Sequence, residues 1–523
     1  MSELHEIVDP LSYPLLFPKG KPLGWTTTMI HSCEHQSKNA KRTRLTVLQF
    51  YAHQLMRREG ASILPHAAGK LFQQYCVDAY CKAEGQRLCW MRNNQGLLRS
   101  EDYGVLKEYV VAQAARSAAP ATAATALAPT VGRPVVLPSS FSGGTRAMQQ
   151  NYQDAMAIVR GCGKPDYFLT FTASPTWPEI ADNLAPGDTA ANRPDLVARV
   201  FHLKFKAFLA VLLEQHVLGV AEGYAWTIEF QKRGLPHAHL LLIMRSADKP
   251  RTATDIDRVV CAELPDKENP DQLELYETVT GSLVHGPCGQ FGAQKPCCNE
   301  HGICSKGFPM DFSETTVLVP DKYPTYRRRE DGRTITKSGV QMDNRWVVPY
   351  NPYLVKLFKA HINVQVCTSI RCVKYLYKYI HKGHDRAAVE VVGAHDEIRD
   401  FLDARYVGPP EACWRLLSFE MHGKSHVVEK LPVHLPGQQV VLFDEEAARG
   451  GAIEAVGRRV REFCSSSNER GSLRNDNHYF QTSICCNPHS TLLGCDVVST
   501  HNKKGHKTYK QGIDASIYFC LPG

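Results

Sequence analysis

The chain contains segments with apolar residues at helical spacing. This spacing recurs over residues 45–57, 69–85 and 144–160, and a longer amphipathic pattern covers residues 195–214. In that longer segment the apolar side chains that share one face are Val197, Val200, Phe201, Phe205, Phe208, Leu209 and Leu212. The pattern predicts a long helix that packs on a core.

Strand-like segments occupy the middle of the chain. Tyr167–Thr172 and Tyr224–Phe230 both have the composition of strands, and a third apolar stretch begins at His237. Residues 232–236, which contain Gly and Pro, predict a hairpin turn between the last two. The order strand, helix, strand, strand predicts an α+β fold whose central antiparallel sheet carries the functional site.

The pattern divides the chain into four parts. Residues 1–111 predict an N-terminal helical domain, with DNA binding as its candidate role, and residues 112–130 form an Ala/Thr/Pro-rich linker. Residues 131–450 predict the domain with the sheet, including a Cys/His insertion at about 281–310. Residues 451–523 are rich in Cys, His, Ser and Asn with little amphipathic period, so no structure is predicted for this divergent tail.

The composition restricts the class of protein but does not identify a function. The 523 residues are 43% hydrophobic and carry a formal charge of +8, which suits a nucleic-acid binder but also many other proteins. Local basic clusters at residues 38–44 and 323–329 are more informative, although each could also be an ordinary solvated face. We find no apolar run long enough to cross a bilayer and no secretory segment at the start, which predicts a soluble intracellular protein without membrane partners.

Two histidines stand at the head of the third apolar stretch. His237 and His239 are separated by one residue, so on a strand both imidazoles point to the same face. Glu229, on the preceding strand, could complete a site of two histidines and one carboxylate for a catalytic Mg²⁺ or Mn²⁺, with Gln231 as its substitute. The alternative is a pair of ordinary histidines on a buried strand.

A second group of candidate residues lies downstream. Residues 371–385 are basic and aromatic, and their helix formers end at a glycine. On a helix Tyr375 and Tyr379 share one face, whereas Tyr377 points about 200° away from Tyr375. Lys378 and Lys382 flank the shared face and could hold a phosphate or favour a phenolate. The alternative is an amphipathic helix with half-buried tyrosines.

The two groups together describe one reaction. A metal held by His237, His239 and Glu229 would polarise a phosphodiester of single-stranded DNA. Tyr375 or Tyr379 would attack the phosphorus, leaving a phosphotyrosine and a free 3′ hydroxyl. The tyrosyl bond keeps the energy of the phosphodiester, so the strand can be rejoined elsewhere without ATP.

Three motifs carry a resemblance to a known family. These are Glu-Phe-Gln-Lys-Arg-Gly-Leu-Pro-His-Ala-His at 229–239, Lys-Tyr-Leu-Tyr-Lys-Tyr-Ile-His-Lys-Gly at 374–383 and Lys-Pro-Asp-Tyr-Phe-Leu-Thr-Phe-Thr at 164–172. They resemble the replication-initiator (Rep) domain of Helitron transposases, rolling-circle enzymes of the His-hydrophobic-His endonuclease superfamily, and the similarity extends from about residue 9 to 436.

The resemblance implies a palm-like fold of the Rep and relaxase type, with His237 and His239 as metal ligands and Tyr375 and Tyr379 as nucleophiles. It also implies nuclear localisation and single-stranded DNA at transposon ends as the partner. Helitron proteins usually carry a helicase after this region, but we find no phosphate-binding Gly-x-x-x-x-Gly-Lys-Ser/Thr loop. ATP-driven unwinding is therefore not predicted for this chain, and a helicase supplied in trans is a candidate partner.

Eighteen cysteines in a reducing compartment favour thiols or zinc ligands over disulfides. The candidate zinc segment opens with His285-Gly-Pro-Cys288 and continues with Cys297-Cys298 and Cys304. Helitron Rep regions resemble this segment, which favours His285, Cys288, Cys297 and Cys304 as structural zinc ligands with Cys298 as a spare. Scattered free thiols are the alternative.

Two other functions compete with the endonuclease. One is a decayed transposon fragment that acts only as a zinc-stabilised DNA-binding protein. The other is an unrelated metallohydrolase that uses the histidine pair with water and needs no tyrosine.

Overall fold

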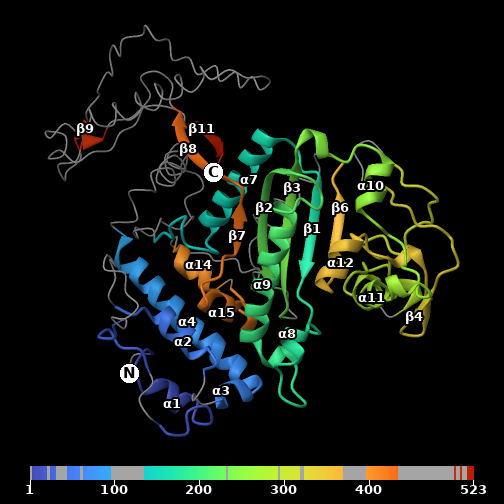
Figure 1. Ribbon diagram of the computed structural model, residues 1–523. Coiled ribbons are helices and arrows are strands. Elements are labelled where there is room, and N and C mark those ends of the chain that lie inside the picture. Colours follow the sequence, from blue (N-terminus) through green and yellow to red (C-terminus); the bar gives the residue numbers. More distant parts are fainter. Residues whose placement is uncertain are drawn as a thin grey trace, which may run out of the picture. The chain divides into compact units, whose positions relative to one another are not determined.

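A computed structural model provides the structure of the chain (Figure 1). It describes residues 3–20, 24–30, 44–58, 63–95, 135–230, 234–292, 295–318, 323–368, 396–403, 405–433, 500–501, 507–508 and 515–522. The chain divides into two compact units. The first comprises residues 1–427 with 520–523, and the second comprises residues 428–519.

A five-stranded sheet forms the centre of the first unit. Its strands lie in the order β6-β1-β3-β2-β7, and all neighbouring pairs are antiparallel. Their bounds are β1 Tyr167–Thr172, β2 Ala221–Phe230, β3 Pro236–Met244, β6 Ile362–Val366 and β7 His422–Lys424. The antiparallel sheet and the mixed α+β class predicted from the sequence are confirmed, and β1 has the predicted bounds.

The long helix α9 (Pro194–Leu213) covers one face of this sheet (Figure 1). Pro194 and Asp195 occupy its first turn, where a missing N–H and a negative charge both suit a helix start. Its aromatic side chains stack on Phe171 of β1, with ring centroids 5.4 Å away for Phe201 and 4.7 Å away for Phe208. The predicted apolar stripe therefore packs on the sheet, and this contact forms the main core.

The opposite face of the sheet is covered at one end by α7 (Thr145–Cys162). The helix approaches β2 at Gly223, where an added Cβ would lie 3.1 Å from both Ile158 and Cys162. A glycine at this position therefore permits close packing. The other end of this face carries the polar side chains of the candidate site.

N-terminal helices pack on the same core as the sheet. Their bounds are α1 Val8–Ser12, α2 Val47–Gln54, α3 Leu64–Ala67 and α4 Lys70–Asn93, which confirm the two helices predicted in this region. Helix α4 contacts α15 (Pro409–Leu416), and α15 in turn contacts α9. A buried ion pair joins Arg405, ahead of α15, to Glu84 of α4.

A long connection links β3 to β6 and contains short elements. These are α10 Ala253–Val259, α11 Leu273–Thr278, β4 Ile335–Lys337, β5 Val340–Met342 and α12 Pro352–Phe358. Two further short helices are α8 Pro178–Ala181, which contacts α9, and α14 Glu397–Asp403, which packs with α4. Among the described helices, none combines the length and the hydropathy needed to cross a bilayer.

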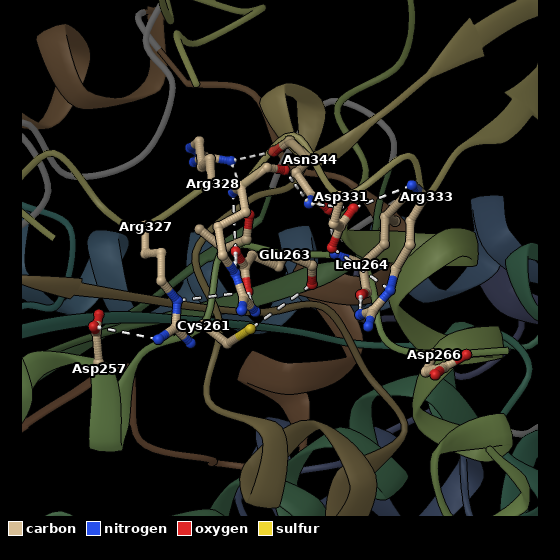
Figure 2. A network of polar contacts seen from close by, with 12 residues as sticks. Asp257, Cys261, Glu263, Leu264, Asp266, Arg327, Arg328, Asp331, Arg333 and Asn344 are labelled. Atoms are coloured by element: carbon tan, nitrogen blue, oxygen red, sulfur yellow. Dashed lines mark hydrogen bonds and ion pairs between the residues drawn. The ribbon is translucent and has the colours of Figure 1, made fainter. Parts of the chain in front are cut away.

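The basic run at 323–329 lies in this connection, and its arginines bind other parts of the protein (Figure 2). Arg328 is 3% exposed, and its guanidinium donates to the carbonyl oxygens of Ala262, Asn344 and Val347. Burial lowers the pKa of Arg328 to about 10. Arg329 pairs with Glu263 at 2.6 Å, and Arg327 lies 3.6 Å from Asp257. The buried Arg328 therefore fixes the connection instead of contacting nucleic acid; the other predicted basic cluster, 38–44, lies outside the described residues except for Arg44.

In the second unit the described residues form short strands. Strand β8 (His426–Val433), most of which belongs to this unit, pairs with β11 (Ala515–Pro522), and β9 (Thr500–His501) pairs with β10 (Lys507–Thr508). The predicted linker at 112–130 and most of the tail lie outside the described residues.

Candidate functional site

Two rows of polar side chains cross the sheet on the face opposite α9. The first row runs from His361, beside Thr172, to His237 and Glu229. The second row consists of Asn363, Thr170, His239, Thr227 and His422, each paired with the next across the strands. Paired residues on neighbouring strands share a face, so these side chains form one polar surface.

Threonines of β1 hold the two predicted histidines. The Thr172 hydroxyl lies 2.7 Å from Nδ1 of His237, and the Thr170 hydroxyl lies 3.2 Å from Nδ1 of His239. A hydrogen bond at one ring nitrogen fixes the ring and leaves the other nitrogen for a ligand. In His239 that other nitrogen, Nε2, lies 3.0 Å from the Glu229 carboxylate. The structure therefore brings His239 and Glu229 into direct contact.

Burial favours the neutral form of His237 and His361. His237 and His239 are both 8% exposed. Burial, and then the nearby positive charge of His239 and His361 when protonated, lower the pKa of His237 to about 4. Burial likewise lowers the pKa of His361 to about 4. Neutral imidazole is the form that binds a metal.

One buried atom of this surface lacks a partner. Among the described residues, Asn363 Oδ1 is buried and makes no hydrogen bond. Asn363 stands beside Thr170, which contacts His239. Buried polar atoms are rarely left unsatisfied, so an unfilled acceptor here fits a site that binds an ion or a substrate group. His237, His239 and Glu229 offer the N and O ligands that a divalent cation needs.

The remaining residues of the predicted catalytic centre lie outside the described residues. These are Gln231, Tyr375, Lys378, Tyr379 and Lys382. The role of each stays a prediction. The structure adds His361, Asn363 and His422 to the polar surface, together with the threonines. The alternation of polar and apolar residues in His-Ile-Asn-Val-Gln-Val at 361–366 could have indicated the first two, because alternate side chains share a face.

The four predicted zinc ligands lie together in the connection between β3 and β6. The ligand atoms of His285, Cys288, Cys297 and Cys304 all lie within 4.8 Å of one another. His285 Nε2 is 3.6 Å from Sγ of Cys288 and 3.6 Å from Sγ of Cys304. Tetrahedral zinc with ordinary bond lengths separates a nitrogen and a sulfur ligand by about 3.6 Å. The cluster could therefore hold a metal such as zinc.

The surroundings of the cluster suit a metal held by thiolates. Burial disfavours the thiolate of Cys288 and raises the pKa of its thiol, so a metal bound there would have to displace the thiol proton. For Cys304, burial acts in the same direction, but backbone N–H groups of Phe308 and Lys306 outweigh it and lower the pKa. His285 stacks on Phe308 with ring centroids 4.4 Å apart, and burial lowers its pKa. A zinc site requires hydrogen-bond donors that point at its thiolates, and it requires its imidazole to be neutral.

Among the described residues, the Cys/His group has at least three ligand atoms this close to one another. The histidines and Glu229 on the sheet do not form such a group. Cys298 also stays outside the set, although its backbone pairs with that of Cys304. The Cys/His cluster is therefore the tighter of the two candidate metal sites.

A comparison with known families gives a match in the first half of the chain. Residues 50–242 match the model of the Helitron helicase-like domain at the N-terminus. The matched segment begins in α2 and ends in β3, so it contains His237, His239 and Glu229. No curated protein matches the chain. The family match supports a Helitron-related, transposon-associated protein.

Proposed function

We propose that the protein is a metal-dependent endonuclease and strand transferase that cuts single-stranded DNA for a Helitron-type rolling-circle transposon in the nucleus. The observation that carries this proposal is the pair His237 and His239, held by two threonines on one face of the sheet and accompanied by Glu229. The family match over residues 50–242 supports the same type of protein.

His237, His239 and Glu229 would hold a Mg²⁺ or Mn²⁺ ion on the polar surface, with Gln231 as the alternative to Glu229. Bound there, the ion would polarise the scissile phosphodiester. The threonines orient the rings through Nδ1. Burial keeps His237 neutral, so protons compete little for its ligand nitrogen near pH 7.

Tyr375 or Tyr379 would act as the nucleophile. Its phenolic oxygen forms a bond to phosphorus, the bond from phosphorus to the 3′ oxygen breaks, and that oxygen takes up a proton to leave a 3′ hydroxyl. The phenolic proton passes to solvent or a nearby base. Lys378 and Lys382 would hold the phosphate or favour the phenolate. Attack by a 3′ hydroxyl of another strand reverses the step and joins the two strands.

Chain lengths support this arrangement. Val366 pairs with Tyr167, whereas His239 and His237 pair with Thr170 and Thr172, about 10 to 17 Å farther along β1. In the helix predicted over residues 371–385, Tyr375 and Tyr379 lie about 6 and 12 Å of rise beyond residue 371. A helix that began level with Val366 and ran back along the sheet would thus bring Tyr379 level with His239.

The test is a search for a covalent adduct. The full chain is incubated with Mn²⁺ or Mg²⁺ and with a set of labelled single strands that are progressively shortened from the 5′ end. We expect a labelled protein band on a denaturing gel. The label must lie on the 3′ side of the cut, because the downstream product keeps the phosphate and stays on the tyrosine. Replacing both Tyr375 and Tyr379 by Phe should abolish the band, whereas Tyr377→Phe should preserve it.

Three outcomes would contradict the proposal in different ways. Cleavage without an adduct would indicate a metallohydrolase that uses water. Binding of DNA without cleavage under either metal would indicate a decayed fragment that acts only as a zinc-stabilised DNA-binding protein. An adduct that maps to Tyr377 would overturn the assignment of the nucleophiles.

A further inference from the structure

A cavity of about 350 Å³ adjoins the polar surface at the β7 edge of the sheet. Its walls come from α2, α4 and α15, from the segment that holds Phe141 and Ser142, and from the turn that leads into β7. All of these elements belong to the first unit. The volume lies in the lower part of the range of small-molecule sites, which suits a single nucleotide better than a larger ligand.

The cavity and the candidate catalytic surface share His422. This residue lines the cavity and also ends the second polar row, where it pairs with Thr227 next to His239. Neighbouring strands are about 4.8 Å apart, so the backbones at His239 and His422 are separated by about 10 Å. A DNA strand cut beside His239 would therefore bring a neighbouring nucleotide to the cavity.

One cation of the cavity is available to a ligand. Arg87 of α4 is exposed and lies over the ring of Phe141, 5.5 Å from its centroid, and no ion pair with another described residue holds it. In contrast, Glu84 on the same wall accepts from the Tyr80 hydroxyl at 2.6 Å and pairs with the buried Arg405. The acidic group of this wall is thus neutralised inside the protein, whereas the guanidinium of Arg87 faces solvent.

The other walls combine aromatic and hydroxyl groups. Phe419 and Tyr80 supply ring surface, and Ser142 and Ser418 supply hydroxyls. Phe419 is itself held in place by stacking on His202, with ring centroids 3.8 Å apart. A cation, fixed aromatic rings and hydroxyl donors are the groups with which proteins bind the phosphate, base and sugar of a single strand.

We propose that this cavity binds one nucleotide of the single-stranded DNA substrate, next to the nucleotide that is cut. Arg87 contacts its phosphate, and the aromatic walls contact its base. The inference rests on the proposed function for the identity of the substrate, but it concerns binding and requires neither cleavage nor the tyrosines.

Binding in EDTA separates this site from the chemistry. Without a divalent cation no strand is cut, and fluorescence anisotropy with a labelled single strand reports affinity alone. We expect Arg87→Gln to weaken binding about five- to tenfold. Because one phosphate contact is lost, the slope of log K against log salt should fall in magnitude by about 0.7.

The matched control is Arg92→Gln on the same helix. Arg92 is also an arginine of α4, but its guanidinium pairs with Asp396 and does not line the cavity. It removes the same charge, so a nonspecific electrostatic effect would lower affinity equally in both variants. We expect Arg92→Gln to change affinity less than about twofold and to leave the salt slope unchanged.

Two further variants probe the cavity without removing Arg87. Ser142→Trp fills the space and should weaken binding at least as much as Arg87→Gln, with a melting temperature checked for each variant. Glu420→Gln removes an exposed carboxylate from another wall of the cavity, the turn that leads into β7. This change should strengthen binding about twofold.

The outcomes distinguish the two proposals. Equal effects of Arg87→Gln and Arg92→Gln, or normal binding by a folded Ser142→Trp protein, would overturn the nucleotide site and leave the endonuclease proposal intact. The expected binding pattern without any adduct in Mn²⁺ would retain the nucleotide site and overturn the endonuclease. Failure of the chain to bind single strands in EDTA would overturn the nucleotide site.

Discussion

His237 and His239 lie on β3, which pairs with β1 and β2 along its length, whereas the Cys/His cluster lies in a connection with few regular elements. The positions of the two histidines are therefore set by the hydrogen bonds of the sheet and by Thr170 and Thr172. The positions of His285, Cys288, Cys297 and Cys304 depend on loops. We therefore expect the arrangement of the sheet site to need no metal, and that of the cluster to depend on a bound metal.

The largest expected effect is on catalysis at the sheet. Replacing His237 and His239 together by Ala should lower adduct formation about a thousandfold or more, because the ion that polarises the phosphodiester is lost. Single-strand binding in EDTA should change little, since most phosphate contacts come from elsewhere. His5→Ala, an exposed histidine far along the chain, is the control. Full cleavage by the double variant would rule out the metal site.

The next effect concerns stability at the cluster. Cys288→Ser should release the metal and lower the free energy of unfolding by at least about 3 kcal/mol, measured by calorimetry together with zinc content. The matched control is Cys298→Ser, since Cys298 lies outside the ligand set, and it should cost less than about 1 kcal/mol. Equal losses of zinc in the two variants would contradict the assignment of ligands.

A smaller effect is expected from the threonine that orients His237. Thr172→Val keeps the shape of the side chain and removes the hydroxyl 2.7 Å from Nδ1. Affinity for Mn²⁺, measured by titration calorimetry, should fall about 10- to 100-fold, because the ring is no longer fixed. Thr227→Val is the control, since the Thr227 hydroxyl donates to the Met421 carbonyl instead of an imidazole. If both variants bind Mn²⁺ equally, the threonine does not orient the ligand.

Acid should weaken metal binding at the Cys/His cluster more than at the sheet site. Thiols of the cluster must lose protons to bind zinc, and burial already raises the pKa of Cys288. Zinc affinity should therefore fall steeply between pH 8 and pH 5.5, by about tenfold per unit for each proton taken up. His237, whose pKa is lowered to about 4 by burial, stays neutral over this range, so protonation of this residue does not weaken Mn²⁺ binding there. Zinc binding is measured by competition with a dye, and Mn²⁺ binding is measured by electron paramagnetic resonance. An equal loss of both metals on acidification would contradict this difference.

Much of the sheet domain could be predicted from local patterns. The helix that became α9 and the strand β1 follow from apolar spacing, because their packing partners lie on one continuous face. The pair His237 and His239 was likewise visible, since alternation alone puts both on one face.

Other features depend on contacts between distant segments. Nothing near Thr170 or Thr172 in the sequence indicates that each hydroxyl contacts an imidazole 65 or more residues away. Arg328 belongs to a run that resembles a phosphate-binding cluster, but the carbonyls that it satisfies come from two other segments, at Ala262 and at residues 344–347. Burial of such a residue follows from the tertiary arrangement and not from local composition.

The direction of β3 and β6 limits how the molecule can be shortened. Both strands are antiparallel to β1, which lies between them, so β3 and β6 run parallel and the chain must return along the sheet to join them. The return from Met244 to Ile362 spans about 20 Å, which at least six or seven extended residues can cover (about 3.3 Å each). In chain length alone a linker of that size could replace the connection, whereas a two-residue hairpin turn would be too short; the shortened domain would still need α12, whose Leu354, Val355 and Phe358 belong to the main core.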